Sequence, residues 1–92
     1  MSVVRVPPVL REEAGGAKEV EASGATLREL LEDLSQRLPA LSDRIYDGSE
    51  IRSYVNVYVD GEDVRTRGGL DAPVRDGATV VLLPAMAGGN GR

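Results

Sequence analysis

The chain lacks the residues on which most catalytic and metal-binding chemistry depends. It contains no cysteine and no histidine in 92 residues. The absence of cysteine excludes disulfides, thiolate nucleophiles and zinc-thiolate sites, and the absence of histidine removes the commonest general base and metal ligand. Catalysis would have to rest on carboxylates, lysine or tyrosine, and no paired set is placed for it. We therefore expect a protein that enzymes act upon, with no catalytic residues and no bound cofactor or metal of its own.

Aromatic residues and positive charge are also scarce. There is no Phe or Trp and only three Tyr, so the core must be aliphatic and no base-stacking platform is available. Eleven Lys and Arg against fifteen Asp and Glu give a net charge of -4, which repels phosphate backbones and anionic membranes. No apolar run reaches bilayer-spanning length, and the N-terminus lacks a signal-peptide pattern. We expect a cytoplasmic protein that binds neither nucleic acid nor membrane.

What is present is the pattern of a single α+β domain. Leucines at helical spacing predict a helix from Leu27 to Leu38, which begins at a capping box of Thr26 and Glu29 and ends at Pro39. A shorter helical turn is expected over 42–46. Apolar runs and alternation predict strands over 3–6, resuming at 9–10 after two prolines, and over 18–22, 54–59, 62–65 and 79–83, with Pro84 ending strand pairing.

Strand parity separates a core face from an outward face of the predicted sheet. The helix stripe is expected to close an aliphatic core with Val55, Val57, Val59, Val80 and Leu82. The opposite parity turns four other side chains outward: Tyr54, Tyr58, Val81 and Leu83. An outward apolar patch beside the end of the chain is what a partner-docking surface needs.

The element order and the last strand, which runs into Gly88-Gly89, resemble the ThiS/MoaD family of ubiquitin-like sulfur carriers. More narrowly, SYVNVYVDGEDVR, then GGL, then VVLLPAMAGG are similar to the CysO-type carriers associated with cysteine biosynthesis. The resemblance implies a ubiquitin-like β-grasp domain over 1–84, with a mixed four- to five-stranded sheet and one main helix packed on one face. It also implies a flexible C-terminal tail over 85–92.

The resemblance further implies a chemistry for the tail. In this family an E1-like enzyme uses ATP to adenylate the C-terminal carboxylate, and sulfide or a persulfide then displaces AMP to leave a thiocarboxylate. The resemblance places that thiocarboxylate on Gly89 and assigns Gly88, Ala87 and Met86 to the slim tail that enters the enzyme's channel, since glycine lacks a Cβ. The implied sulfur acceptor is a PLP-dependent cysteine synthase, so ATP, PLP and zinc belong to partner enzymes.

The sequence departs from the family pattern after Gly89, because it continues with Asn90-Gly91-Arg92. Three explanations stay open: a JAMM-type zinc peptidase removes these residues, the chain is not a carrier, or they are foreign to the natural chain. Other roles also stay open. They are the small subunit of molybdopterin synthase, sulfur delivery to a thiosugar or another secondary metabolite, and a ubiquitin-like modifier that is joined to lysines.

Overall fold

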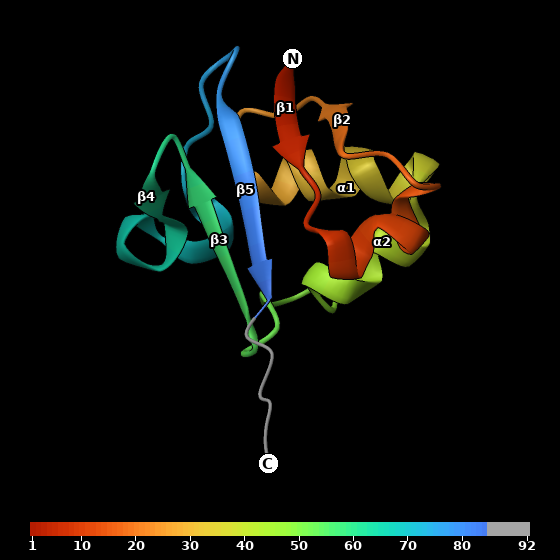
Figure 1. The fold of residues 1–92 in the computed structure, drawn as a ribbon. Coiled ribbons are helices and arrows are strands. Elements are labelled where there is room, and N and C mark those ends of the chain that lie inside the picture. Colours follow the sequence, from red (N-terminus) through yellow and green to blue (C-terminus); the bar gives the residue numbers. More distant parts are fainter. Residues whose placement is uncertain (85–92) are drawn as a thin grey trace.

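The protein folds around a five-stranded mixed sheet with strand order β2-β1-β5-β3-β4 (Figure 1). The computed structural model describes residues 1–84. The strands are β1 Ser2–Arg5, β2 Glu19–Ala22, β3 Val55–Val59, β4 Glu62–Asp63 and β5 Thr79–Pro84. The central strands β1 and β5 run parallel, whereas the other three pairs are antiparallel. This topology confirms the expected β-grasp, with five strands.

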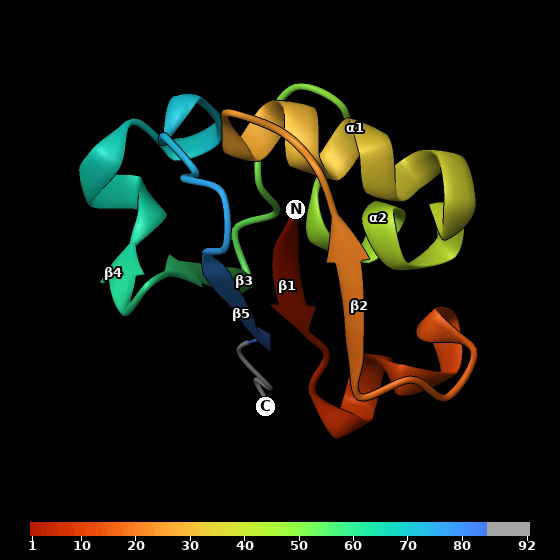
Figure 2. The same cartoon turned by 90° about the horizontal axis from the view of Figure 1, so that it is seen from above.

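Two consecutive helices, α1 Leu27–Arg37 and α2 Pro39–Ile45, cover one face of the sheet (Figure 2). The predicted capping box is present at the start of α1. Thr26 Oγ1 accepts a hydrogen bond from the Glu29 N–H at 3.3 Å, and Glu29 Oε1 accepts one from the Ala25 N–H at 2.9 Å. No helix within residues 1–84 combines the length and apolarity that a bilayer crossing demands.

The core lies between the helices and this face of the sheet, as strand parity predicts. From α1 it receives four fully buried leucines: Leu27, Leu30, Leu31 and Leu34. From the sheet it receives Val55, Val57, Val80 and Leu82, none of them more than 1% exposed. Val59, which we also expected in the core, is only half-buried and packs against its margin. It is the last residue of β3 before the Asp60-Gly61 turn, at the rim of the sheet.

The prediction that the first strand resumes at Val9-Leu10 is wrong. These residues belong to a 3-10 helix, η1, over Pro8–Ala14. Proline cannot donate a hydrogen bond to a sheet but fits the first turn of a helix, so Pro7-Pro8 ends the strand and begins η1. Leu10 remains buried, now from the helix. As a consequence β1 is shorter than its neighbour β5.

The second helix and the return strand also differ from prediction. The helical turn expected over 42–46 is the helix α2, which begins at Pro39, because this proline both ends α1 and occupies the first turn of α2. The strand expected over 62–65 stops at Asp63, whose carboxylate accepts the Arg65 N–H at 2.9 Å and caps the 3-10 helix η2, Val64–Arg67. A further 3-10 helix, η3, follows at Gly69–Asp71.

The last strand extends one residue further than predicted. Pro84 was expected to end pairing, yet it stays in register opposite Val55. A proline at the end of a strand loses only its N–H donor and keeps its carbonyl acceptor. At the start of β3, by contrast, Tyr54 lies one residue outside the strand. Pro84 is therefore the last residue of β5, the middle strand of the sheet.

Candidate functional site

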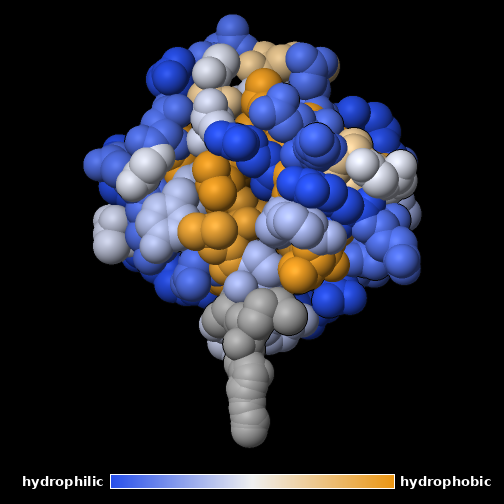
Figure 3. All heavy atoms as spheres, in the orientation of Figure 1, coloured by the Kyte–Doolittle hydropathy of each residue, from blue (hydrophilic) through white to orange (hydrophobic). Residues whose placement is uncertain are grey.

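The face of β5 and β3 that the helices leave uncovered carries apolar side chains. The antiparallel register sets Tyr58 opposite Val81 and Asn56 opposite Leu83. Leu83 is 47% exposed and Tyr54 46% exposed, while Tyr58 and Val81 are half-buried. Apolar side chains gather over the lower part of β5, next to the point where the described chain ends (Figure 3). The parity prediction is confirmed, and we call these four residues the apolar face: Tyr54, Tyr58, Val81 and Leu83.

The register that creates the apolar face is fixed at its far end by Asp60. One carboxylate oxygen of Asp60 accepts the Thr79 N–H at 3.0 Å, and the other accepts Arg75 Nε at 2.9 Å. The Asp60 N–H donates to the Thr79 carbonyl at 2.9 Å. Asp60 and Gly61 have φ of 50° and 87°, which suits a two-residue hairpin turn. A slip of one residue would break these bonds and turn Leu83 inward.

The other margin of the apolar face is held by Arg65. Its Nη1 donates to Asn56 Oδ1 at 3.0 Å, and its Nη2 donates to the carbonyls of Val55 at 2.8 Å and Arg52 at 3.1 Å. Arg65 thus ties η2 to the start of β3. It also fixes the amide of Asn56 beside Leu83, so a polar group borders the apolar face.

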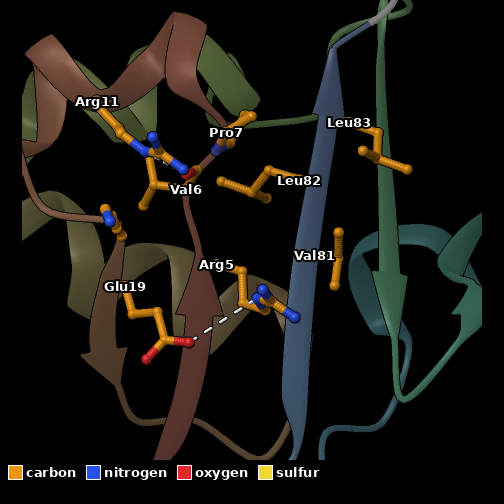
Figure 4. Close-up of a pocket in the computed structure, with 9 residues that line it drawn as sticks. Arg5, Val6, Pro7, Arg11, Glu19, Val81, Leu82 and Leu83 are labelled. Atoms are coloured by element: carbon orange, nitrogen blue, oxygen red, sulfur yellow. Dashed lines mark hydrogen bonds and ion pairs between the residues drawn. The ribbon is translucent and has the colours of Figure 1, made fainter.

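A groove of about 450 Å³ adjoins the apolar face on the side of β1. Because β1 ends at Arg5, opposite Val81, while β5 continues to Pro84, one side of the last residues of β5 has no neighbouring strand. The groove fills this space, and Figure 4 shows Arg5 pointing across it toward β5. Its lining is Arg5, Val6, Pro7, Arg11, Lys18, Glu19, Val81, Leu82 and Leu83. We call it the β5 groove.

The carboxylates with perturbed pKa values lie away from this surface. Hydrogen bonds from backbone N–H groups lower the pKa of Asp33, through Ser23, and of Asp47, through Ser49 and Glu50. The N-terminal ammonium lowers the pKa of Asp76. These carboxylates are stabilised in their charged form and serve the fold. Within residues 1–84 there is also no cluster of acidic side chains that could hold a metal ion.

The tail residues predicted to carry the chemistry, Met86, Ala87, Gly88 and Gly89, lie outside the described residues. Sequence reasoning missed the Arg65–Asn56 contact and the β5 groove. The outward parity of Arg5 was a usable signal for the groove. No sequence pattern placed Arg11 and Lys18 beside the groove, because Arg11 belongs to η1 and Lys18 directly precedes β2.

Comparison with known proteins decides the family. The sequence pattern of the ThiS family matches residues 4–89, which is nearly the whole chain. The chain belongs to the ThiS family. It is 44% identical over 89 residues to the sulfur carrier protein CysO of Mycobacterium tuberculosis, a match that covers 94% of this chain and 96% of that protein.

Solved structures agree with this family assignment. A chain in the Amycolatopsis orientalis BexX/CysO complex matches with a TM-score of 0.90 and 44% identity, covering 97% of this chain and all of the other. Small archaeal modifier protein 1 of Methanosarcina acetivorans matches with a TM-score of 0.81 and 26% identity, covering 96% of this chain and 95% of the other. These relatives and the family place the chain among small ubiquitin-like carrier proteins, and its relatives include sulfur carriers.

Proposed function

We propose that the protein carries sulfur as a thiocarboxylate on Gly89. An E1-like enzyme joins the Gly89 carboxylate to the α-phosphate of ATP and releases pyrophosphate. Sulfide attacks the acyl carbon and AMP leaves. If a persulfide attacks in its place, AMP again leaves, and a thiol reductant then cleaves the S–S bond of the acyl disulfide that has formed, itself becoming a disulfide. The product has one carboxylate oxygen replaced by sulfur, and the sulfur atom is held by the chain until an acceptor enzyme removes it.

The observation that carries this proposal is the position of the apolar face. It lies at the end of β5, so a partner that binds it stands at the root of the tail. The family match supports Gly89 as the functional end, because it extends to residue 89 and no further. The apolar face exposes Leu83 and Tyr54 without any catalytic group of its own, which suits a protein that delivers its tail to other enzymes' active sites.

The acceptor we propose is a PLP-dependent cysteine synthase. Support comes from the similarity to CysO over nearly the full length of both chains. The thiocarboxylate sulfur would add to the β-carbon of an aminoacrylate that the synthase holds on its cofactor. The bond formed is C–S, and the acyl group remains on sulfur as a thioester until it is released. This chain contributes the nucleophile and its docking surface.

Activation requires that whatever follows Gly89 is removed first. An amide bond between Gly89 and Asn90 leaves no carboxylate for adenylation. We propose that a JAMM-type zinc peptidase hydrolyses this bond, with one water molecule supplying the new carboxylate and amine. Gly88 and Gly89 leave room for an extended chain in a narrow peptidase or adenylation channel, because they carry no Cβ.

Intact-mass measurement of the protein isolated from its native host tests the proposal. We expect a chain that ends at Gly89, part of which carries the mass increase of one sulfur replacing one oxygen. Treatment with an alkylating reagent should label that part alone, since the chain has no cysteine. A population that always retains Asn90 and never reacts with the reagent would contradict it.

A second role, as a ubiquitin-like protein modifier, is favoured by one observation. Haloferax volcanii small archaeal modifier protein 3 is 31% identical over 65 residues, 71% of this chain. In that role the amine of a lysine attacks the activated Gly89, and AMP leaves as an isopeptide bond forms. The same mass measurement separates the roles, because a modifier gives a ladder of larger adducts in place of a sulfur-for-oxygen shift.

A further inference from the structure

We propose that the β5 groove is a second docking element, which binds an extended acidic segment of the adenylating partner. Carboxylates of that segment are held by Arg5, Arg11 and Lys18, and an aliphatic side chain of the same segment packs against Pro7. The identity of the partner rests on the proposed function, whereas the chemistry of the occupant rests on the groove itself.

The cations of the groove have unused hydrogen-bonding capacity. Arg5 makes only a loose ion pair, with its Nε 3.8 Å from Glu19 Oε2, and both side chains are more than half exposed. Arg11 uses Nε to donate to the Val6 carbonyl at 3.1 Å, which fixes its direction and leaves its Nη atoms without a partner within residues 1–84. Lys18, the single lysine of the chain, forms no ion pair in the same part of the chain. A guanidinium group whose Nη atoms lack a partner can bind both oxygens of a carboxylate at once.

The charge of the groove is opposite to that of the molecule. The whole chain carries -4, yet three cations and one anion line the groove. The net charge of the chain disfavours an acidic segment, whereas the three cations of the groove attract it, so the groove helps to set the orientation of the partner. Glu19 forms a loose ion pair with Arg5 (Figure 4). The incoming carboxylate would take the place of Glu19 beside Arg5, or share Arg5 with it.

The shape of the groove favours an extended segment. It runs along the side of β5 that β1 leaves uncovered, with Pro7 on the β1 side and Leu83, whose side chain points toward β3, across β5 from it (Figure 4). An aliphatic side chain packed against Pro7 would lie next to the apolar face, since Leu83 borders the groove and belongs to that face. A partner that occupies the groove and the apolar face together holds β5 from two sides, just before the tail leaves the domain.

The test uses the chain ending at Gly89 and its cognate adenylating enzyme. Calorimetric affinity is measured for the unsubstituted chain, for Arg5→Gln with Lys18→Gln, and for a control with the same loss of charge elsewhere, Arg44→Gln with Arg67→Gln. Both control residues are half-exposed members of surface ion pairs. Pyrophosphate release is measured in parallel, and thermal melting checks that each variant is folded.

We expect the groove variant to bind about tenfold more weakly, because it loses two exposed cations that contact the acidic partner. The affinity of the control variant should change less than about twofold, because its two arginines lie elsewhere on the surface. The affinity of the unsubstituted chain should fall with salt more steeply than that of the groove variant. If the groove variant binds as tightly as the control, the proposal for the groove is overturned.

The two proposals fail separately in this experiment. If pyrophosphate is released and the groove substitutions do not change the affinity, the proposed function stands and the proposal for the groove is overturned. Binding that depends on the groove without pyrophosphate release keeps the groove and contradicts the proposed function. Lys18→Gln alone serves as the second variant and should also weaken binding, because Lys18 is exposed and its side chain makes no ion pair within residues 1–84.

Discussion

Adjacent leucines on β5 should respond in opposite ways to the same truncation. Leu82 is 1% exposed, so Leu82→Ala leaves a cavity in the core and should lower the free energy of unfolding by about 2 to 5 kcal/mol. For a domain of this size that corresponds to a fall in melting temperature of at least about 10 °C. Leu83 is 47% exposed and should cost the fold about 1 kcal/mol or less.

Affinity for the adenylating enzyme should be affected more by Leu83→Ala than by Leu82→Ala. If docking buries the exposed half of Leu83, the apolar contribution is roughly half of the 1.5 to 3 kcal/mol for a whole leucine side chain, or about 1 kcal/mol. Leu83→Ala should therefore weaken binding to the adenylating enzyme about fivefold. Leu82→Ala should bind almost normally at a temperature where it is fully folded.

Thermal melting and calorimetric titration of both variants check this pair of expectations. The parity of β5 links them, because a register shifted by one residue would exchange the two phenotypes. A Leu83→Ala variant that melts early and binds normally when folded would refute both the register and the apolar face.

Three further changes have defined outcomes. A Cβ at Gly24 would overlap the backbone at Leu30, so Gly24→Ala should lower the free energy of unfolding by about 1 to 3 kcal/mol in a denaturant titration, and an unchanged midpoint would contradict this. The lowered pKa of Asp33 means that its charge stabilises the fold above the ordinary value of 3.8, and that this stability is lost as the pH falls through the folded pKa. The difference in unfolding free energy between the native chain and Asp33→Asn should thus shrink in acid, and a pH-independent difference would refute that account. Gly88→Val should leave the melting temperature unchanged yet slow adenylation, and a parallel loss of both would count against a free tail.

Much of the fold could be predicted because local patterns decided it. Alternation from Val55 to Val59 indicated both the strand and its buried side, and the Asp60-Gly61 pair indicated the turn that follows. The capping box at Thr26 located the start of α1 within one residue. In each case the pattern within a few neighbouring residues sets the local conformation and its buried side, so it can be read from the sequence.

The parts that could not be predicted depend on contacts between distant segments. The β5 groove exists because β1 ends before β5 does, and the relative lengths of two parallel strands cannot be read from either strand alone. Arg11 reaches the groove only because Pro7-Pro8 diverts the chain into η1. Arg65 reaches Asn56 through a 3-10 helix where alternation suggested a strand.

Adenylation of the chain with and without the residues after Gly89 tests the central claim most directly. The full chain and a chain ending at Gly89 are each incubated with the cognate E1-like enzyme, ATP and a sulfide source, with no peptidase present. The products are followed by pyrophosphate release and intact mass. The account predicts that only the chain ending at Gly89 releases pyrophosphate and gains the mass of sulfur in exchange for oxygen. Equal activation of both chains, or of neither, would contradict it.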